Sequence, residues 1–448
     1  MSLFHEENPM ERVHKQAIAL VQGCRDVHDW SVRTVRRRSV ELYLVRDAVE
    51  SRRTVETVRT LAEVHRDLRG PGGEPQRGAS SFTLLPDEGL SSAQAKRDQA
   101  LFAAGLALNP PYTLPGPTAY PQVEVWDPAL SEHPHDVLED LACQLLAQLA
   151  REPRVGPSSA EFYLYLTETH LTNSQGVDAQ ARDAELFAEL VLLSSDGHDE
   201  SEFYAALRRR ALRDLDLPSE VARYAARARD SLSVGPPPTR RGPVVVSGQA
   251  LVDLLAYLRH ASSGATKYQH LTRWELGQPI CGSHPVQGDP LTLVADATLP
   301  WGVGTVPFDD DGVPGQRTLL VENGICRRFW TDYHHAQYLG CPATGAFGNL
   351  CIPSGTVPLA DLLGEGPLFH IVSFASMDPD PITGEFVGEI RLGYDVQGGV
   401  LRPFKGGALS GNMERALAQV RFSQEVAFLG SYHGPEAARF GDLAVGGD

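Results

Sequence analysis

The stretch that decides the fold runs from Asp378 to Asn412 and reads DPDPITGEFVGEIRLGYDVQGGVLRPFKGGALSGN. Its glycines separate short extended segments, a pattern typical of successive β-strands joined by tight turns. At its start, Pro379 and Pro381 each restrict the residue before them, so DPDP predicts a rigid extended turn. The sequence around this stretch, from residue 243 to residue 448, is also rich in Gly, Pro and short alternating segments. We therefore expect a β-rich C-terminal domain.

The first 234 residues predict a different kind of domain, a mixed α/β unit with antiparallel strands. Apolar periodicity and capping residues indicate helices over residues 11–23, 92–108, 134–151 and 201–232, the last broken near Leu217-Pro218. Alternating or β-branched segments indicate strands at 30–35, 39–45, 54–64 and 161–167. The run GPPPTRRG, residues 235–242, predicts a stiff linker between the two domains. The fold class we expect is α+β.

Composition argues against a nucleic-acid-binding, membrane-spanning or secreted protein. The 448 residues carry a formal net charge of −17, which argues against the basic surface that nucleic-acid binding needs. No apolar run approaches the roughly 20 residues needed to cross a bilayer. The N-terminus lacks the pattern of a secretory signal, and the six cysteines form no CxxC pair. We expect a cytoplasmic protein with reduced thiols, no membrane association and no nucleic-acid partner.

Motifs for catalysis are missing from the sequence. It contains no HExxH or HExxxH, no GxSxG and no GxxxxGK[ST]. Cys326, His334, His335 and Cys341 lie close together in the sequence, but neighbouring histidines on a strand would point to opposite faces. The favoured interpretation is that both cysteines are buried as small apolar residues. Asp309-Asp310-Asp311-Gly312 lacks the spacing of a calcium loop and predicts a turn.

Several short motifs, taken in order, resemble the TldD/PmbA peptidase family. They include PFDDDGVP (307–314), LVENG (320–324), TGAFGN (344–349), TGEF (383–386), GY (393–394), GGALSGN (406–412) and, more weakly, NSQG (173–176). The segment LRHASSGA (258–265) stands where the zinc-bearing TldD branch has its HExxxH helix. It is similar instead to the SAxSG segment of the TldE/PmbA branch.

The resemblance implies a non-catalytic subunit in a heterodimeric zinc metallopeptidase that processes unfolded or precursor peptides. The TldD-like partner would contribute the zinc, and this chain would hold no metal, no cofactor and no catalytic residue. It would form a chamber wall that binds peptide in extended form, because a peptide strand can add to a sheet edge through backbone hydrogen bonds. The residues we expect to line that surface are Gly393, Tyr394, Gly406, Gly407, Ser410 and Asn412.

Two alternatives stay open at this point. One is a stand-alone peptide-tailoring hydrolase that uses Cys326, His334 or His335, and Cys341. The other is a homodimeric peptide-binding scaffold without a peptidase partner.

Overall fold

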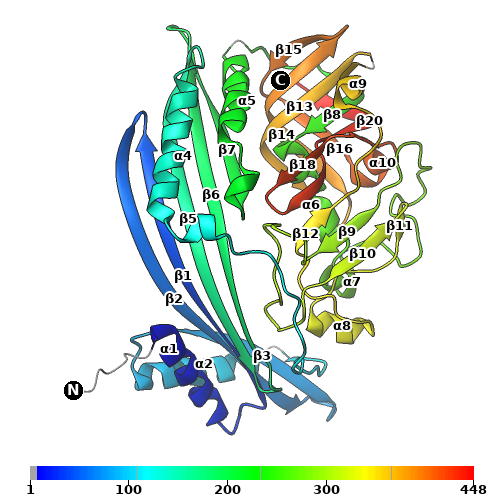
Figure 1. Cartoon of the computed structure of the whole chain (residues 1–448). Helices are drawn as coiled ribbons and strands as arrows, with labels where there is room; N and C mark the ends of the chain where they lie inside the picture. Colours follow the sequence, from blue (N-terminus) through cyan, green and yellow to red (C-terminus); the bar gives the residue numbers. More distant parts are fainter. Residues whose placement is uncertain (1–7, 107, 233, 365, 448) are drawn as a thin grey trace.

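The computed structural model describes residues 8–447 except 107, 233 and 365, and it has two parts (Figure 1). The N-terminal part is a long antiparallel sheet with helices on one face. The C-terminal part contains two further sheets and lies against the other face. This arrangement confirms the α+β fold class.

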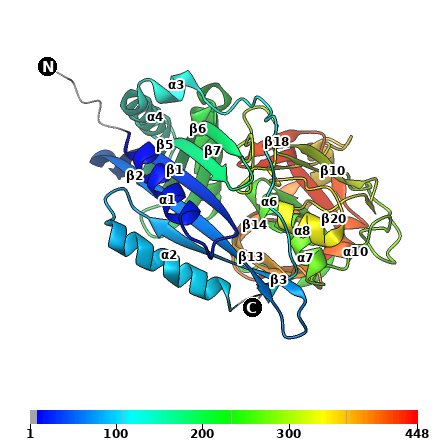
Figure 2. The ribbon, with the colours of Figure 1, turned by 90° about the horizontal axis from the view of Figure 1, so that it is seen from below.

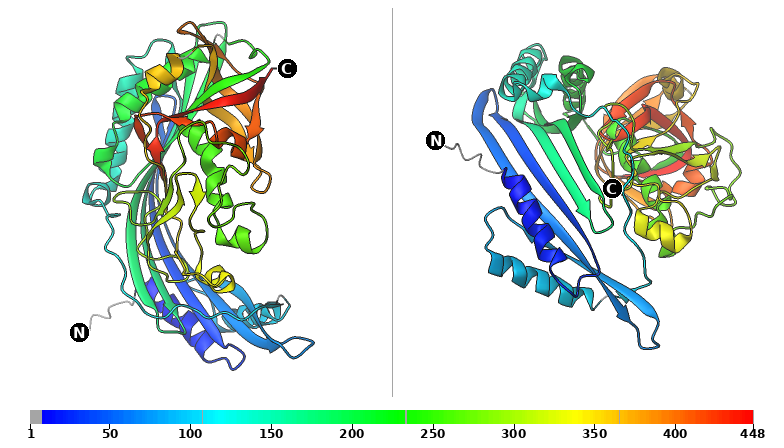
Figure 3. Two further views of the ribbon diagram at one scale, coloured as in Figure 1. Left: turned by 90° about the vertical axis from the view of Figure 1, so that its right-hand side faces the viewer. Right: turned by 60° about the horizontal axis from the view of Figure 1, so that its bottom comes forward.

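The N-terminal sheet has the strand order β4-β3-β2-β1-β5-β6-β7. Its strands are β1 (Asp29–Val45), β2 (Ala48–Arg69), β3 (Pro75–Leu84), β4 (Leu108–Asn109), β5 (Val155–Asn173), β6 (Asp178–Ser195) and β7 (Glu200–Arg209). The four strands from β2 to β6 in this order are long and bow along the C-terminal part (Figure 3). Because side chains alternate along a strand, each strand gives one set of residues to the helices and the other set to the C-terminal part.

Helices cover the outer face of this sheet in two groups (Figures 1 and 2). One group is α1 (Pro9–Gln22) and α2 (Leu90–Ala104), which share a core with β1, β2 and β3. The other is α3 (Pro128–Ser131), α4 (Pro134–Leu149) and, after the short turn η1 (Leu212–Asp214), α5 (Leu217–Asp230). In β2, Ala62 and Val64 pack in the α1–α2 core, which turns Glu63 and His65 toward the C-terminal part.

One C-terminal sheet closes on itself. It follows the order β13-β8-β20-β16-β14-β15, and β13 also pairs with β14. The strands are β8 (Arg240–Ser247), β13 (Leu368–Pro379), β14 (Glu385–Gln397), β15 (Val400–Phe404), β16 (Ala408–Asn412), β17 (Arg421–Phe422) and β20 (Ala437–Gly446), with β17 pairing β20. Residues 378–412 thus form the end of β13, the turn that follows it, and the strands β14, β15 and β16.

The other C-terminal sheet has the order β11-β10-β9-β12-β19-β18. Its strands are β9 (Leu293–Asp296), β10 (Arg317–Glu322), β11 (Ile325–Cys326), β12 (Asn349–Cys351), β18 (Val426–Leu429) and β19 (Tyr432–Pro435). The helices of this part are α6 (Gln249–Ala261), α7 (Gly264–Tyr268), α8 (Tyr333–Leu339), α9 (Leu359–Gly364) and α10 (Met413–Leu417). Both sheets and α6 contribute to one large core.

A second core continues from the N-terminal part into the C-terminal part. Leu190 and Tyr224 of the former share it with Val245, Val372 and Val396 of the latter. This shared apolar packing fixes how the two parts face each other.

The structure corrects three expectations from the sequence. Residues 201–209 are the strand β7 rather than a helix, because Phe203, Ala205 and Leu207 alternate into the core while β7 pairs with β6. The separate strands expected at 30–35 and 39–45 are one strand, β1. The linker expected at 235–242 ends early, since β8 begins at Arg240.

No helix in the described part of the chain is long and apolar enough to cross a membrane.

Candidate functional site

A cleft lies between the N-terminal sheet and the C-terminal part. It contains two cavities of about 650 and about 1060 Å³, and Arg208, Val303 and Ser431 line both of them. We name them by their charged residues. The acidic cavity is lined by Glu63, Asp309, Asp310, Asp311 and Asp332, and the arginine cavity by Arg208, Arg209, Arg210, Arg223 and Arg227. The shared residues make the two cavities adjoining parts of one cleft.

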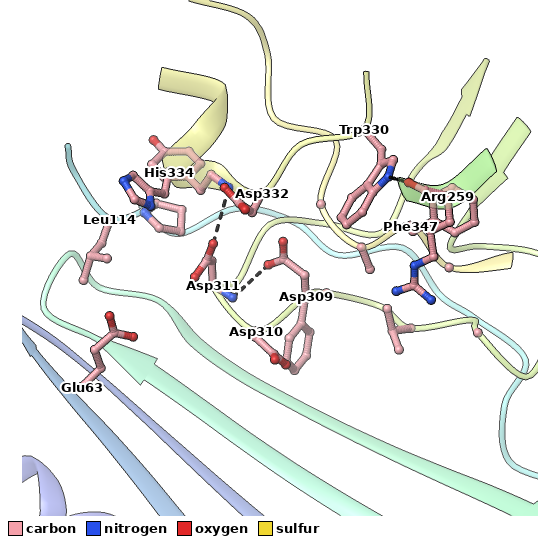
Figure 4. A pocket seen from close by; sticks show the side chains of 18 of the residues that line it. Glu63, Leu114, Arg259, Asp309, Asp310, Asp311, Trp330, Asp332, His334 and Phe347 are labelled. Atoms are coloured by element: carbon pink, nitrogen blue, oxygen red, sulfur yellow. Dashed lines mark hydrogen bonds between the residues drawn. The ribbon is translucent and has the colours of Figure 1, made fainter. Parts of the chain in front are cut away.

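The acidic cavity has one wall from each part of the chain. Glu63 and His65 project from the inner face of β2, and Asp311 projects from the loop before β10 (Figure 4). Figure 4 shows the Glu63 carboxylate rising from β2 into the cavity and the Asp311 carboxylate above it, turned toward the start of α8. The strand alternation of β2 and the geometry of the loop therefore bring these two acids together.

The loop is held by its first aspartate. Asp309 Oδ1 accepts backbone N–H groups from Asp311, Gly312 and Val313 at 3.0, 2.9 and 2.8 Å. Gly312 has φ +96°, a conformation that favours glycine. This confirms the expected turn, and it shows that the turn also lines a cavity. Asp309 is occupied by these backbone contacts, whereas Asp311 accepts one long bond, from the backbone N–H of Tyr333 at 3.4 Å.

Burial shapes the charge of these acids. Burial, with the nearby charge of Asp311, raises the pKa of Glu63 to about 7. Burial and the charge of Asp311 raise the pKa of Asp309 to about 7, against the opposing effect of its backbone hydrogen bonds. Burial first, and then the charge of Asp332, also raises the pKa of Asp311. Carboxylates facing one another in a partly buried space resist ionising together.

Two imidazoles complete this cavity. Burial, with the charge of Arg77, lowers the pKa of His65 to about 4, and burial lowers the pKa of His334. His65 Nδ1 lies 3.2 Å from the hydroxyl oxygen of Tyr112, and the rings of Tyr112 and His334 stack with centroids 4.0 Å apart. Both imidazoles are therefore neutral at pH 7, and they do not balance the carboxylates.

A proline-rich segment, residues 109–121, ties the two walls together beside this cavity. Asn173 Nδ2 of β5 donates to the carbonyl of Pro115 at 2.8 Å. Gln337 of α8 accepts from the backbone N–H of Thr113 at 2.9 Å, and Tyr120 donates to the carbonyl of Gly312 at 3.1 Å. The segment has no helix and only Asn109 within a strand, as its prolines predict.

The arginine cavity is bordered by β7 and α5. Arg208 pairs with Glu185 at 3.4 Å and Arg209 with Glu220 at 3.5 Å. Burial, with the charge of Arg223, lowers the pKa of Arg227. Charges of both signs line each cavity. Carboxylates predominate in the acidic cavity, which Arg208 and Arg259 also line, and the arginine cavity is also lined by Asp214, Glu220, Asp253 and Glu436.

The six residues expected to bind peptide lie in the closed C-terminal sheet, and none of them lines either cavity. A Cβ on Gly393 would lie 2.6 Å from Phe404 Cζ, and the buried Tyr394 donates to Asp230 at 2.8 Å. Gly406 and Gly407 have φ of +80° and +66° in the turn between β15 and β16. Ser410 pairs with Val387 and Ala444, and Asn412 caps α10 through the backbone N–H of Arg415.

Each of these six residues therefore has a structural role, and their assignment to peptide binding stays a prediction. Glu63 and His65 line the acidic cavity although no sequence motif indicated them. The alternation within β2 could have placed them on the face opposite Ala62 and Val64.

The cysteines and histidines of the hydrolase alternative do not lie on one element. Cys326 is fully buried in the core on β11, and His334 and His335 lie on α8 rather than on a strand. The argument about opposite faces of a strand was therefore wrong, because adjacent residues on a helix are about 100° apart. His335 Nδ1 lies 2.7 Å from Asp332. Within the described residues, no group of three or more His, Cys, Asp or Glu side chains is placed to hold a metal ion.

The segment in place of a zinc helix does not fit zinc. It spans the end of α6 and the start of α7, and His260 is its one imidazole, exposed on the last turn of α6. Ser262 Oγ donates to the carbonyl of Leu258 at 2.6 Å. A Cβ on Gly264 would lie 2.1 Å from Thr331 Cγ2, so this glycine permits close packing. One imidazole and two hydroxyls do not form the donor set that structural or catalytic zinc requires.

Comparison with known proteins places the C-terminal part. Residues 239–447 match the model of the PmbA/TldA metallopeptidase C-terminal domain. This part of the chain is therefore a PmbA/TldD C-terminal domain. Metalloprotease PmbA of Escherichia coli O157:H7 is 25% identical over 357 residues, which cover 75% of this chain and 75% of that protein.

Other relatives match over shorter lengths. An uncharacterized protein of Methanocaldococcus jannaschii is 26% identical over 257 residues, 54% of this chain and 58% of that protein. The TldD homologue of Buchnera aphidicola from Acyrthosiphon pisum is 28% identical over 136 residues, 27% of this chain and 28% of that protein. The first relatives are therefore matched over less than two thirds of their own length.

Solved structures share the whole fold. TldE from Thermococcus kodakarensis superposes with a TM-score of 0.79 at 19% identity, covering 98% of this chain and 100% of that chain. A candidate DNA gyrase modulator from Bacteroides thetaiotaomicron gives a TM-score of 0.81 at 16% identity and covers 100% of both chains. The arrangement of N-terminal sheet and C-terminal part is thus common to this fold.

Proposed function

We propose that this chain is the non-catalytic, TldE/PmbA-like subunit of a heterodimeric zinc metallopeptidase. It acts in the cytoplasm on unfolded or precursor peptides, and its cleft binds the peptide in extended form. The partner is a TldD-like subunit that supplies the zinc. The observation that best supports this proposal is the cleft itself, which lies between the N-terminal sheet and the C-terminal part and is lined by both acidic and basic side chains.

Two further observations support the proposal. The sequence has no HExxH or HExxxH, and the segment at 258–265 lacks the ligands for zinc. The match to PmbA extends over three quarters of the chain. The Cys326–Cys341 hydrolase gains no support from the structure, because Cys326 is buried in the core and its Sγ donates to the carbonyl of Arg328 rather than to a histidine.

The experiment is to express the chain alone and together with an HExxxH-bearing relative from the same genome. We expect a one-to-one complex by light scattering, zinc in proportion to the partner, and cleavage of unfolded peptides only by the complex. Stoichiometric zinc with full activity in the lone chain would overturn the proposal. A stable homodimer that binds peptide and ignores the relative would favour the scaffold alternative.

A large side chain placed in the cleft tests whether the cleft takes part in peptide cleavage. Ser431 is exposed and lines both cavities, so Ser431→Trp should reduce cleavage by the complex strongly while zinc content and complex formation stay unchanged. Ser283 is exposed and lines neither cavity, so Ser283→Trp is the matched control. Equal activity of both variants would exclude the cleft from peptide binding.

A further inference from the structure

The acidic cavity is lined by two carboxylates, Glu63 and Asp311, that come from different parts of the chain. The basic side chain beside Glu63 is the neutral His65, whose Nε2 lies 3.7 Å from Glu63 Oε1, too far for a hydrogen bond. Asp311 has the single long contact with the backbone N–H of Tyr333. Within the described residues, neither acid pairs with a lysine or an arginine. Its neighbour Asp310 differs, because it is exposed and pairs with Arg33.

A buried nitrogen without a partner faces the same space. His65 is 1% exposed, lines the cavity, and its Nε2 makes no hydrogen bond in the structure. In the neutral tautomer that donates Nδ1–H to Tyr112, this Nε2 presents a lone pair next to Glu63. His334 Nε2, in the same cavity, is also buried without a partner. Unsatisfied buried polar groups are rare in native proteins, and a ligand with N–H donors would satisfy these.

The acceptors on these residues match one kind of ligand. We propose that the acidic cavity binds a primary ammonium group of the peptide, either its free N-terminus or a lysine side chain, with Glu63 and His65 Nε2 as its acceptors and the Asp311 carboxylate as a nearby negative charge. The proposal rests on the proposed function and names the substrate feature that the cleft recognises. An ammonium has three donors around one nitrogen, which suits separate acceptors on facing walls. A guanidinium is planar and prefers both oxygens of one carboxylate.

A divalent metal ion fits this site less well. Calcium takes six to eight oxygen ligands and magnesium requires octahedral geometry. Here Asp309 is already occupied by three backbone N–H groups, and the described residues form no group that could hold a metal. The ring of Tyr112, stacked on His334, adds an aromatic wall that also favours an organic cation.

The test uses matched peptides without other charges, measured by calorimetry with the full chain and with the heterodimer. One peptide carries a lysine, one carries norleucine at the same position, and both have blocked ends. A third has a free N-terminus and no lysine. We expect the two peptides with an amine to bind at least about tenfold more tightly than the norleucine peptide, about 1.4 kcal/mol.

Substitutions then locate the subsite. Glu63→Gln and Asp311→Asn keep the shape of the side chains. The first removes a charge-assisted contact and the second removes a nearby negative charge, and each should weaken binding of the amine peptides about tenfold. Neither should change binding of the norleucine peptide. The matched control is Glu56→Gln, on the same strand as Glu63 but paired with Arg36 at 3.0 Å and lining neither cavity, and it should leave all affinities unchanged. Thermal melts show whether each variant is folded.

The source of the ammonium is separated by pH. A free N-terminus has a pKa near 7.7–8.0 and a lysine near 10.4, so at pH 9 the N-terminal peptide should lose affinity while the lysine peptide keeps it. Equal binding of lysine and norleucine peptides would overturn this inference and leave the proposed function intact. If no peptide binds the chain or the complex, both fail. Binding of calcium or zinc alone, abolished by the same two substitutions, would replace the ammonium with a metal.

Discussion

Arg77 donates to the backbone of Tyr112, a residue that lines the acidic cavity, and its removal gives the sharpest test of how this wall is packed. The side chain lies on β3 and is 7% exposed. Its Nη1 donates to Asp29 at 2.7 Å and to the carbonyl of Tyr112 at 2.7 Å. Its Nε and Nη2 donate to Asp67 at 2.6 and 2.9 Å. The arginine therefore joins two strands of the sheet to the proline-rich segment beside the cavity.

The magnitude follows from the exposure of each partner. The Asp29 side chain is 11% exposed, and breaking a buried pair by removing one partner costs about 3–5 kcal/mol. Asp67 is 47% exposed, so its pair contributes less than about 1 kcal/mol. We expect Arg77→Met, which keeps much of the side-chain volume, to lower the free energy of unfolding by about 4 kcal/mol. Asp67→Asn should lower it by less than about 1 kcal/mol.

The pH dependence has a definite sign. Burial acts to raise the pKa of Asp29, but hydrogen bonds from Ser174, Arg77 and Gln175 outweigh it and lower the pKa. Because the pKa in the folded protein is below that of the unfolded chain, near 3.9, the stabilisation is present above this value. It is lost as the pH falls through the pKa of the folded protein. The difference between wild type and Arg77→Met should therefore persist down to about pH 4 and shrink below it.

The assay is urea unfolding by linear extrapolation, with hydrogen exchange over residues 109–121. Arg77→Met should speed exchange in this segment, since the carbonyl of Tyr112 loses its donor. The double variant with Asp29→Asn should recover part of the loss, because no unpaired buried charge then remains. A loss below about 1 kcal/mol in Arg77→Met, or an equal loss in Asp67→Asn, would refute this reasoning.

Three further predictions concern the cleft walls. The raised pKa of Glu63, about 7 against about 4.3 unfolded, makes stability fall as the pH rises through this window. Since this side chain is 38% exposed, Glu63→Gln should raise the free energy of unfolding at pH 8 by at most about 1 kcal/mol and leave it unchanged at pH 4. Asn349 is 1% exposed and makes three hydrogen bonds, to Asp296, Thr305 and Gly304, so Asn349→Ala should cost about 3 kcal/mol in urea unfolding. Gly348 has φ +67°, and a Cβ there would lie 2.4 Å from Ala297 Cα, so Gly348→Ala should lower the melting temperature far more than Gly430→Ala, where φ is +59° and the space is open.

Local patterns allowed part of the N-terminal elements to be predicted. The helices α1 and α4 follow apolar periodicity that is strong within a few turns. The failure at β7 has a physical cause. Its sequence, ESEFYAALRR, contains good helix formers, and only the long pairing with β6 and the core beneath α5 make it a strand.

The sequence by itself determined the β-rich character of residues 378–412, the turn at Asp309 and the lack of a zinc-binding motif, because each depends on neighbouring residues. Tertiary structure alone decided the site. Glu63 and Asp311 lie on separate parts of the chain, and both line one cavity. They do so because side chains alternate along β2 and because a shared core packs the two parts together. The same packing buried His65 Nε2 without a partner and raised the pKa of Glu63. Burial and the repulsion between like charges arise only when the two walls come together, so local sequence patterns do not predict them.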